Sequence, residues 1–196
     1  MNWPVTELSL IHRPALLRHF LELDAHDRRL RFGAPLTNAA IRAYMARIDY
    51  ERDALFGVFD DDLEIIGAAH VARADEHVEL GVSVRRGYRN RGLGAALLMR
   101  AVLRARNWGG RALFMHCLRE NETIMHLARK QGMHVVTDHG EADGWLGLPP
   151  ADASTHFGEV FAQRVALFDY ALKSQLAGAR RLVAAGLSSS NARDDE

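Results

Sequence analysis

The chain has 196 residues, 48% of them hydrophobic and 26% charged, a balance typical of one globular domain with an appended element. Its 25 Lys and Arg residues offset 25 Asp and Glu residues, so bulk charge gives no reason to expect nucleic acid or a membrane as a partner. No apolar run approaches the roughly 20 residues of a membrane span, and the N-terminus has no basic start followed by an apolar core. We therefore expect a cytoplasmic location, and Cys117, the single cysteine, fits a reducing compartment.

The first half of the chain is predicted to contain two helices followed by three strands. Residues 5–11 alternate like a strand, Pro14 suits the first turn of a helix ending near residue 24, and Thr37 can cap a helix ending near residue 48. Between these helices, residues 28–33 form a run too short and too charged to predict an element of its own. The three strands are expected at residues 54–59, 63–73 and 76–85, joined by tight turns.

The second half continues with alternating helices and strands. The sequence predicts a helix at 92–107, a strand at 111–117, a helix at 121–131 and a strand pair at 133–139 and 143–148. Glycines just after the two helices stop them, and Pro149-Pro150 closes the first domain, which we place at residues 1–150.

Residues 151–187 predict a C-terminal amphipathic helix, and residues 188–196 predict a disordered polar tail. The helix carries an apolar stripe at steps of four, four, three, four, four and seven, made of Phe157, Phe161, Val165, Phe168, Leu172, Leu176 and Val183. Leaving its phenylalanines in water would forfeit about 1.5–3 kcal/mol of burial each. We expect the stripe to pack on its own domain; the alternative is pairing with the same helix of a second subunit in a homodimer.

The most informative motif lies between residues 82 and 97, where an apolar strand ends, a loop rich in arginine and glycine follows, and an Ala/Leu-rich helix begins. Glycines let the backbone approach an anion closely, and the first amides of a helix point outward at the positive end of its dipole. The pattern therefore indicates a pyrophosphate pocket. A P-loop is excluded because no lysine precedes the helix. A dinucleotide-binding fingerprint is also excluded, because neither its glycine spacing nor its acidic residue is present.

The pattern Arg89-x-x-Gly92-x-Gly94, after two hairpin-linked strands, resembles the signature of the GNAT superfamily of acyl-CoA-dependent N-acetyltransferases. The run from Asn121 to Met133 is similar to a second helix motif of that family, at a spacing that admits one helix and one strand. The resemblance covers residues 5–148. Further segments resemble the GNAT domains of Pat-type bacterial protein-lysine acetyltransferases, namely residues 27–36, 48–55, 79–84 and 140–148.

The resemblance implies an α/β (α+β) fold of the GNAT type, with a mixed, strongly twisted central sheet flanked by helices and, here, an additional long C-terminal helix. The strands at 76–85 and 111–117 would splay apart, and acetyl-CoA, the coenzyme A donor, would lie in the gap. Its pantetheine arm would pair with the backbone of Val82 and Val84 and meet Asn121 on its far side. Its pyrophosphate would sit on the amides of Arg89, Asn90, Arg91, Gly92, Leu93, Gly94 and Ala95.

The reaction implied is direct attack of a primary amine, on a small molecule or a protein lysine, on the acetyl thioester. An alkylammonium with a pKa near ~10.4 must first lose a proton, and the resemblance makes Glu79 the base. The alternative to this catalytic role is that Glu79 only faces solvent or pairs with an arginine. A backbone N–H at Val84 or Arg85, freed by a β-bulge, would stabilise the oxyanion.

One position departs from the family: its tyrosine acid, which protonates the leaving thiolate, is replaced by Ala128. Tyr44 and Tyr88 are possible substitutes, and His70 and His116 could line the acceptor pocket. The missing acid keeps open an alternative function, a non-catalytic acyl-CoA-binding regulatory protein. The ten histidines show no tight ligand spacing with a third partner, so no metal site is expected.

Overall fold

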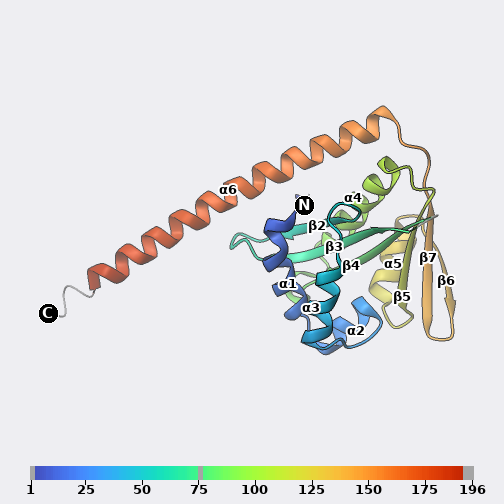
Figure 1. The fold of residues 1–196 in the computed structure, drawn as a ribbon, viewed down its shortest axis with the longest axis horizontal. Helices are drawn as coiled ribbons and strands as arrows, with labels where there is room; N and C mark the ends of the chain where they lie inside the picture. The colour runs from blue at the N-terminus through green and yellow to red at the C-terminus, as the bar shows by residue number, and fades with distance from the viewer. Residues whose placement is uncertain (1–2, 75–76, 192–196) are drawn as a thin grey trace.

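The computed structural model describes residues 3–74 and 77–191, with side chains up to Arg180. Seven strands form one sheet in the order β1-β2-β3-β4-β5-β7-β6, with helices on both faces (Figure 1). The strands are β1 (Thr6–Leu8), β2 (Ala54–Phe59), β3 (Ile65–Arg73), β4 (Val78–Val84), β5 (Ala112–Leu118), β6 (His134–Asp138) and β7 (Glu141–Gly147). The helices are α1 (Arg13–Leu21), α2 (Ala25–Phe32), α3 (Asn38–Arg47), α4 (Leu93–Asn107), α5 (Glu122–Lys130) and α6 (Ala153–Asn191).

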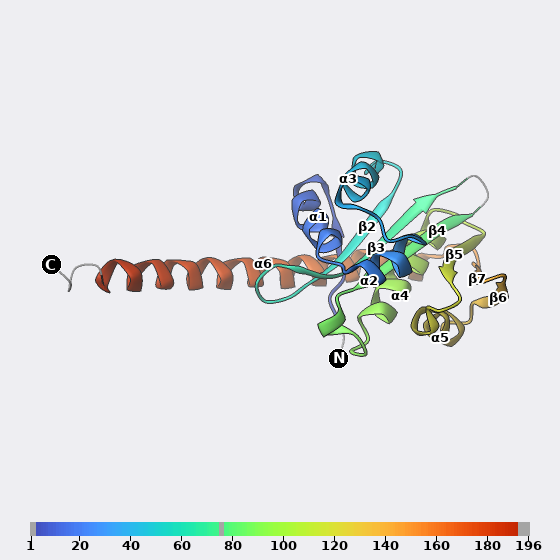
Figure 2. The same cartoon turned by 90° about the horizontal axis from the view of Figure 1, so that it is seen from below.

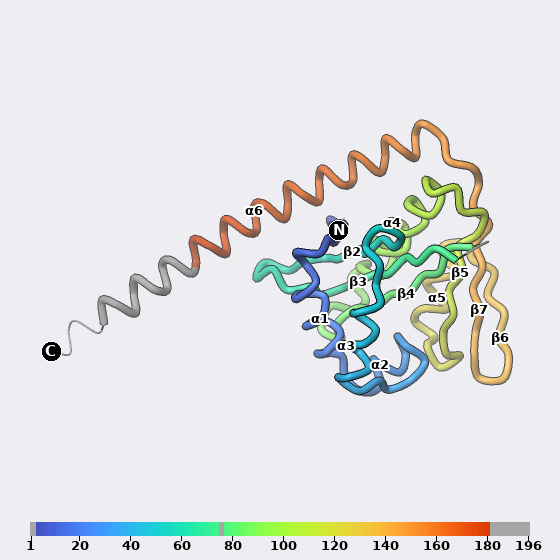
Figure 3. The backbone as a smooth tube through the Cα atoms, viewed as in Figure 1, coloured from blue at the N-terminus to red at the C-terminus, as the bar shows by residue number. Residues whose placement is uncertain are grey.

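The centre of the sheet opens where β4 meets β5. These two strands run parallel and pair at only two positions, Val78 with Leu113 and Glu79 with Phe114, whereas β5 pairs with β7 along its whole length. Beyond Glu79 the two strands diverge. The mixed sheet and this divergence confirm the fold expected from the sequence, and the trace in Figure 3 shows β5, β6 and β7 leaning away from the other strands.

Each face of the sheet has its own apolar core. Leu93, Leu97 and Leu98 of α4 pack with Leu113 on one face, where α5 also lies. On the other face, α1 and α3 pack through residues such as Phe20 and Ile41. Because side chains alternate along a strand, β4 presents Leu80 and Val82 to the first core and Glu79, Gly81 and Ser83 to the second face.

Helix α2 occupies the segment for which the sequence predicted no element. Asp24 caps it by accepting the Asp27 N–H at 2.8 Å, and Gly33, at φ +77°, ends it. The Arg28 guanidinium donates to the carbonyls of Leu21, Leu23 and Leu36. The two caps and the hydrogen bonds of Arg28 stabilise a helix here, although the charged composition of the segment is typical of a loop. The strand predicted at 5–11 is also shorter, because a 3₁₀ turn at Leu10–His12 leads into α1.

Helix α6 runs along α4 and β1 and then extends well beyond the sheet (Figure 1, Figure 2). It continues through Asn191, so the predicted tail is helical up to there, and residues 192–196 lie outside the described part. Glu159 anchors it: burial acts to raise the pKa of this carboxyl, but hydrogen bonds from Asn107, Arg100 and Arg104 outweigh burial and lower the pKa to about 2. Lys173 also donates to the Phe59 carbonyl at 2.9 Å.

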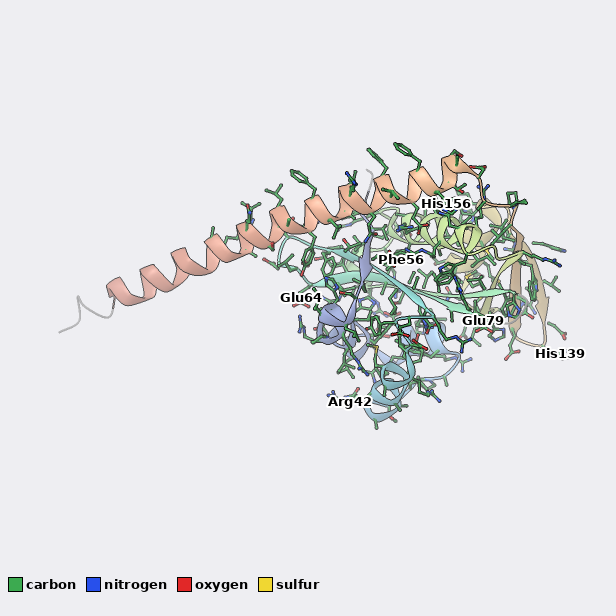
Figure 4. All side chains as sticks on the ribbon, turned by 45° about the horizontal axis from the view of Figure 1, so that its top comes forward. Arg42, Phe56, Glu64, Glu79, His139 and His156 are labelled. Carbon is green, nitrogen blue, oxygen red and sulfur yellow. The ribbon has the colours of Figure 1, made fainter. Side chains whose placement is uncertain are left out.

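The expected packing of the apolar stripe on its own domain is wrong for the part whose side chains are described. Phe157, Phe161 and Phe168 are 73%, 61% and 74% exposed, and Figure 4 shows aromatic rings standing off the outer side of α6. The helix docks instead through the opposite side, where Glu159 and the fully buried Ala166 lie. Among the described helices, none combines the length and apolar character needed to cross a membrane.

Candidate functional site

The loop before α4 and the first turn of that helix present unpaired backbone amides. Gly92 caps α4 at φ +85°, a conformation that L side chains rarely adopt, and Asn90 precedes it at φ +59°. The first hydrogen bond of the helix runs from the Ala96 N–H to the Gly92 carbonyl at 3.1 Å. The N–H groups of residues 93–95 therefore have no acceptor inside the helix and lie at its positive end.

Gly94 is required for a different reason. A Cβ on Gly94 would lie 3.1 Å from a methyl group of Leu127, so the glycine lets α5 approach α4 closely. A cavity of about 140 Å³ lies beside these amides, between α2, the end of β4 and the start of α5. Eight of the ten residues expected at the donor site line it, namely Val82, Val84, Arg89, Asn90, Gly92, Leu93, Gly94 and Asn121, whereas Arg91 and Ala95 do not.

The backbone of β4 faces this cavity at Val82 and Val84. The Arg85 N–H donates to the Ile66 carbonyl at 2.9 Å, and β3 and β4 pair without a register shift from Gly67–Val84 to Arg73–Val78. In such an antiparallel ladder the alternate residues, Val82 and Val84, turn their N–H and C=O groups away from β3. The bulge expected at Val84 or Arg85 is therefore absent and the Arg85 N–H is already used, whereas the Val84 N–H faces the opening.

Most of the arginine charge in the loop is neutralised by acids from the α1–α2 region and from the turn before β3. Arg89 contacts the buried Asp27 at 2.7 Å and donates to the Val84 carbonyl. The other pairs join Arg85 to Glu22 and Glu64, and Arg86 to Asp24. Within the described residues Arg91 has no carboxylate within 4.0 Å, and it lies over the Tyr88 ring. The loop thus offers an anion its backbone amides and one free guanidinium.

A second cavity, of about 420 Å³, opens on the α1–α3 face of the sheet and shares Leu30 and Arg31 with the first. Glu79 and Gly81 of β4, His70 of β3 and Tyr44 of α3 line it. The Arg31 guanidinium lies directly across Gly81, where an added Cβ would sit 2.4 Å from its central carbon. Only glycine at that strand position leaves room for the guanidinium at the junction of the two cavities.

A chain of hydrogen bonds runs along one wall of this second cavity. Arg31 donates to the Tyr44 hydroxyl at 3.0 Å, that hydroxyl lies 2.7 Å from Nδ1 of His70, and Nε2 of His70 lies 3.0 Å from Asp53. Burial lowers the pKa of His70, an effect that the hydrogen bond from its Nε2 to the Asp53 carboxylate partly offsets. The imidazole is therefore neutral at neutral pH. The sequence suggested His70 as a pocket residue and Tyr44 as a substitute for the missing acid, but it gave no sign of Arg31 or Asp53.

Glu79 and His116 occupy the rim of the same cavity. The Glu79 side chain is 57% exposed and lies 3.5 Å from His77 rather than beside an arginine, and Figure 4 shows it on β4, away from α6. His116 is 45% exposed and pairs with Asp143 at 2.8 Å. Glu79 thus lies at the last position where β4 and β5 pair, immediately before the gap opens.

The other candidate groups are less available. Ala128 is completely buried in the α4–α5 core, on the face opposite Tyr44, and Tyr88 donates its hydroxyl hydrogen to Asp60 at 3.2 Å. Burial raises the pKa of the Cys117 thiol, which argues against a nucleophilic role. Within the described residues no group of three or more His, Cys, Asp or Glu side chains could hold a metal ion.

Comparisons with known proteins agree with this geometry. A family model described as "Acetyltransferase (GNAT) family" matches residues 18–133, more than half of the chain. No curated protein matches this chain. Among solved structures, the GNAT domain of PAT from S. lividans is 17% identical, with a TM-score of 0.64 over 74% of this chain and 89% of that one.

Two further solved structures contain the acyl donor. YncA from Salmonella typhimurium, with its cofactor acetyl-CoA, is 16% identical, with a TM-score of 0.61 over 78% of this chain and 98% of that one. A phosphinothricin acetyltransferase from Sinorhizobium meliloti, in complex with acetyl-CoA, is 17% identical, with a TM-score of 0.60 over 78% and 95%. At these identities the likeness establishes the fold that the three structures share.

Proposed function

Because the chain belongs to the Acetyltransferase (GNAT) family, we propose that it transfers the acetyl group of acetyl-CoA to a primary amine. The acceptor is a small molecule or a protein lysine, and the reaction takes place in the cytoplasm. The observation that carries the proposal is the pair of cavities that meet at the opening between β4 and β5. One holds backbone amides suited to a diphosphate, and the other holds titratable groups suited to an amine.

The donor side is assigned to the α4 N-terminus and β4. The amides from Arg89 to Ala95 hold the pyrophosphate, with residues 93–95 contributing the three amides that lack a helical acceptor. Val82 and Val84 pair with the pantetheine arm as a neighbouring strand would, and Asn121 lies across the cavity from them. Of the loop arginines, Arg91 is the one available to meet a phosphate oxygen.

On the acceptor side, Glu79 removes the proton from the incoming ammonium. Its position at the rim, half in water, places its carboxylate within reach of a cation entering from solvent. The N–H of Val84 or Val82, turned toward the opening, stabilises the oxygen of the tetrahedral adduct. No bulge is needed for this, because the strand alternation already leaves both amides without a partner in β3.

We also propose that a second copy of this chain covers the exposed stripe of α6. The described part of the stripe spans about 30 Å of helix and exposes roughly 600 Å² per chain, so that two copies bury about 1,200 Å², the lower end for a stable interface. Its steps of four, four and three repeat every 11 residues, which predicts that two such helices wind in a right-handed supercoil.

A second candidate function is a non-catalytic acyl-CoA-binding regulator, which the buried Ala128 favours by removing the thiol-protonating tyrosine. The Glu79→Gln variant tests the choice. Thiol release from acetyl-CoA with an amine should fall about 100-fold or more while acetyl-CoA binding by calorimetry is unchanged. Tight acetyl-CoA binding without thiol release by the parent protein, with any amine or peptide tried, would support the regulator instead.

A further inference from the structure

The hydrogen-bond chain from Arg31 to Asp53 has a fixed direction. A guanidinium carries only donors, so the Tyr44 oxygen must accept from Arg31. The Tyr44 O–H is then left to donate to Nδ1 of His70, which must be unprotonated. The single imidazole proton therefore sits on Nε2 and is donated to the Asp53 carboxylate. The contacts thus define the tautomer of a neutral His70.

This chain stands beside the opening between β4 and β5. His70 is the direct cross-strand partner of Gly81, and Arg31 lies across Gly81 itself. Tyr44 and His70 line the acceptor cavity, while the His70 and Asp53 side chains are only 13% and 15% exposed. The phenol is thus the end that meets a bound acceptor, and the imidazole and carboxylate are screened behind it.

Two protons leave the nitrogen when an alkylammonium becomes an amide. Under the proposed function, on which this inference rests, Glu79 takes the first and makes the amine a nucleophile. Attack then forms the C–N bond and leaves a second excess proton on the nitrogen of the tetrahedral adduct. Nothing assigned so far receives that proton, and Ala128 provides no acid for the departing thiolate.

We propose that Tyr44, backed by His70 and Asp53, is the proton relay that receives this second proton. The Tyr44 oxygen accepts the proton from the adduct nitrogen as its own hydrogen moves to Nδ1 of His70, and the resulting imidazolium is held by Asp53. When the C–S bond breaks, the proton returns through Tyr44 to the cavity, where the coenzyme A thiolate leaves as a base. Tyr44 is then a catalytic residue, and His70 and Asp53 act through it.

The charges around His70 suit this role. Burial lowers the pKa of His70, and Arg31 of α2 lowers it further, whereas Asp53 before β2 and Glu79 of β4 oppose them. His70 is therefore unprotonated at neutral pH, and it can still accept a proton transiently during the reaction. Arg31 also stabilises negative charge that develops on the Tyr44 oxygen during transfer, which a neutral neighbour would not do.

Two acceptor probes separate the two protons. Methylamine is an ammonium at pH 7.5 and needs both deprotonations, whereas hydroxylamine is already neutral and needs only the second. With acetyl-CoA and saturating amine, Tyr44→Phe should slow thiol release with both probes by about 100-fold, and Glu79→Gln should slow it with methylamine only. Tyr50→Phe is the matched control, because Tyr50 is a half-buried neighbour that does not line the cavity; its rates should be unchanged.

A spectroscopic measurement tests the proton relay independently of any structural role of Tyr44, His70 and Asp53. ¹⁵N-histidine NMR at pH 7.5 should show His70 as the neutral tautomer with its proton on Nε2, and Asp53→Asn should shift its titration to lower pH. A proton on Nδ1, or unchanged rates in Tyr44→Phe while acetyl-CoA still binds, overturns the relay and leaves the proposed function standing. If the parent protein acetylates neither probe, the proposed function fails and the relay fails with it.

Discussion

The cavity beside the α4 amides, which we propose as the donor groove, and the second cavity, which we propose as the acceptor cavity, share β4 but are built from different material. The groove is made of backbone: amides at the α4 N-terminus and alternate peptide groups of β4. The acceptor cavity is made of side chains from α2, α3, β3 and β4 that are far apart in sequence, such as Arg31, Tyr44, His70 and Glu79. A backbone site tolerates most changes of side chain, whereas a side-chain site can change its acceptor by single substitutions.

The strongest way to break the donor side alone is Gly92→Glu. The change strains a residue at φ +85° and places a carboxylate among the amides that we propose receive phosphate. Acetyl-CoA affinity should fall by more than 100-fold in calorimetry. Gly87→Glu adds the same charge to the same loop at a residue that does not line the groove, and it should keep most of the affinity. Thermal protection of Gly92→Glu by acetyl-CoA would refute the pyrophosphate assignment.

A buried histidine that bonds to β4, the strand that both regions share, makes the stability of the protein depend on pH. His19 of α1 is fully buried and bonded to the Ile65 carbonyl and the Ser83 hydroxyl, and burial lowers its pKa from 6.5 to about 4. The unfolded chain therefore takes up a proton between these values while the folded chain does not, so stability falls as the pH drops from 6.5 to 4. The loss should reach up to about 3 kcal/mol in urea unfolding. A His19→Gln variant should lack most of this slope; an equal slope in both proteins would assign it elsewhere.

On the acceptor side, the substitution that corresponds to Gly92→Glu is Gly81→Ala. The new methyl group must displace the Arg31 guanidinium, which breaks the hydrogen bond to Tyr44, while the groove amides stay in place. We expect a fall of about tenfold in the rate of acetyl transfer to methylamine, with acetyl-CoA affinity unchanged in calorimetry. Gly147→Ala, where an added Cβ meets no atom within 4 Å, is the control. A loss of acetyl-CoA affinity in Gly81→Ala would show that the two regions are not separable.

The smallest catalytic effect is expected outside both regions. Replacing Phe161 and Phe168 by Glu should convert the proposed dimer to a monomer in analytical ultracentrifugation without changing acetyl-CoA affinity, because α6 docks through its other side. Arg164→Glu, beside the stripe, should preserve the dimer and serves as a charge control. If the parent protein is monomeric at 100 µM, a second copy of the chain is not the partner of the stripe.

The sequence indicated the residues of the proposed donor groove much better than those of the proposed acceptor cavity, and the difference has a physical origin. Gly92 and Gly94 stand at fixed spacing because one backbone angle and one close helix contact demand them, so a local pattern records the site. Asp53 and Tyr44 meet His70 only because α3 folds back over β3, and no local pattern records such a contact. Helix α2 was missed because its stability comes from caps and from Arg28, which reaches carbonyls outside the helix.

The account depends on where the two halves of acetyl-CoA lie, and a crystal structure of the protein with coenzyme A tests this most directly. The diphosphate is predicted within hydrogen-bond distance of the N–H groups of residues 93–95, with the pantetheine arm along Val82 and Val84 and the sulfur beside Gly81 and Arg31. A diphosphate bound elsewhere, or a sulfur directed away from the Tyr44 cavity, would contradict the account.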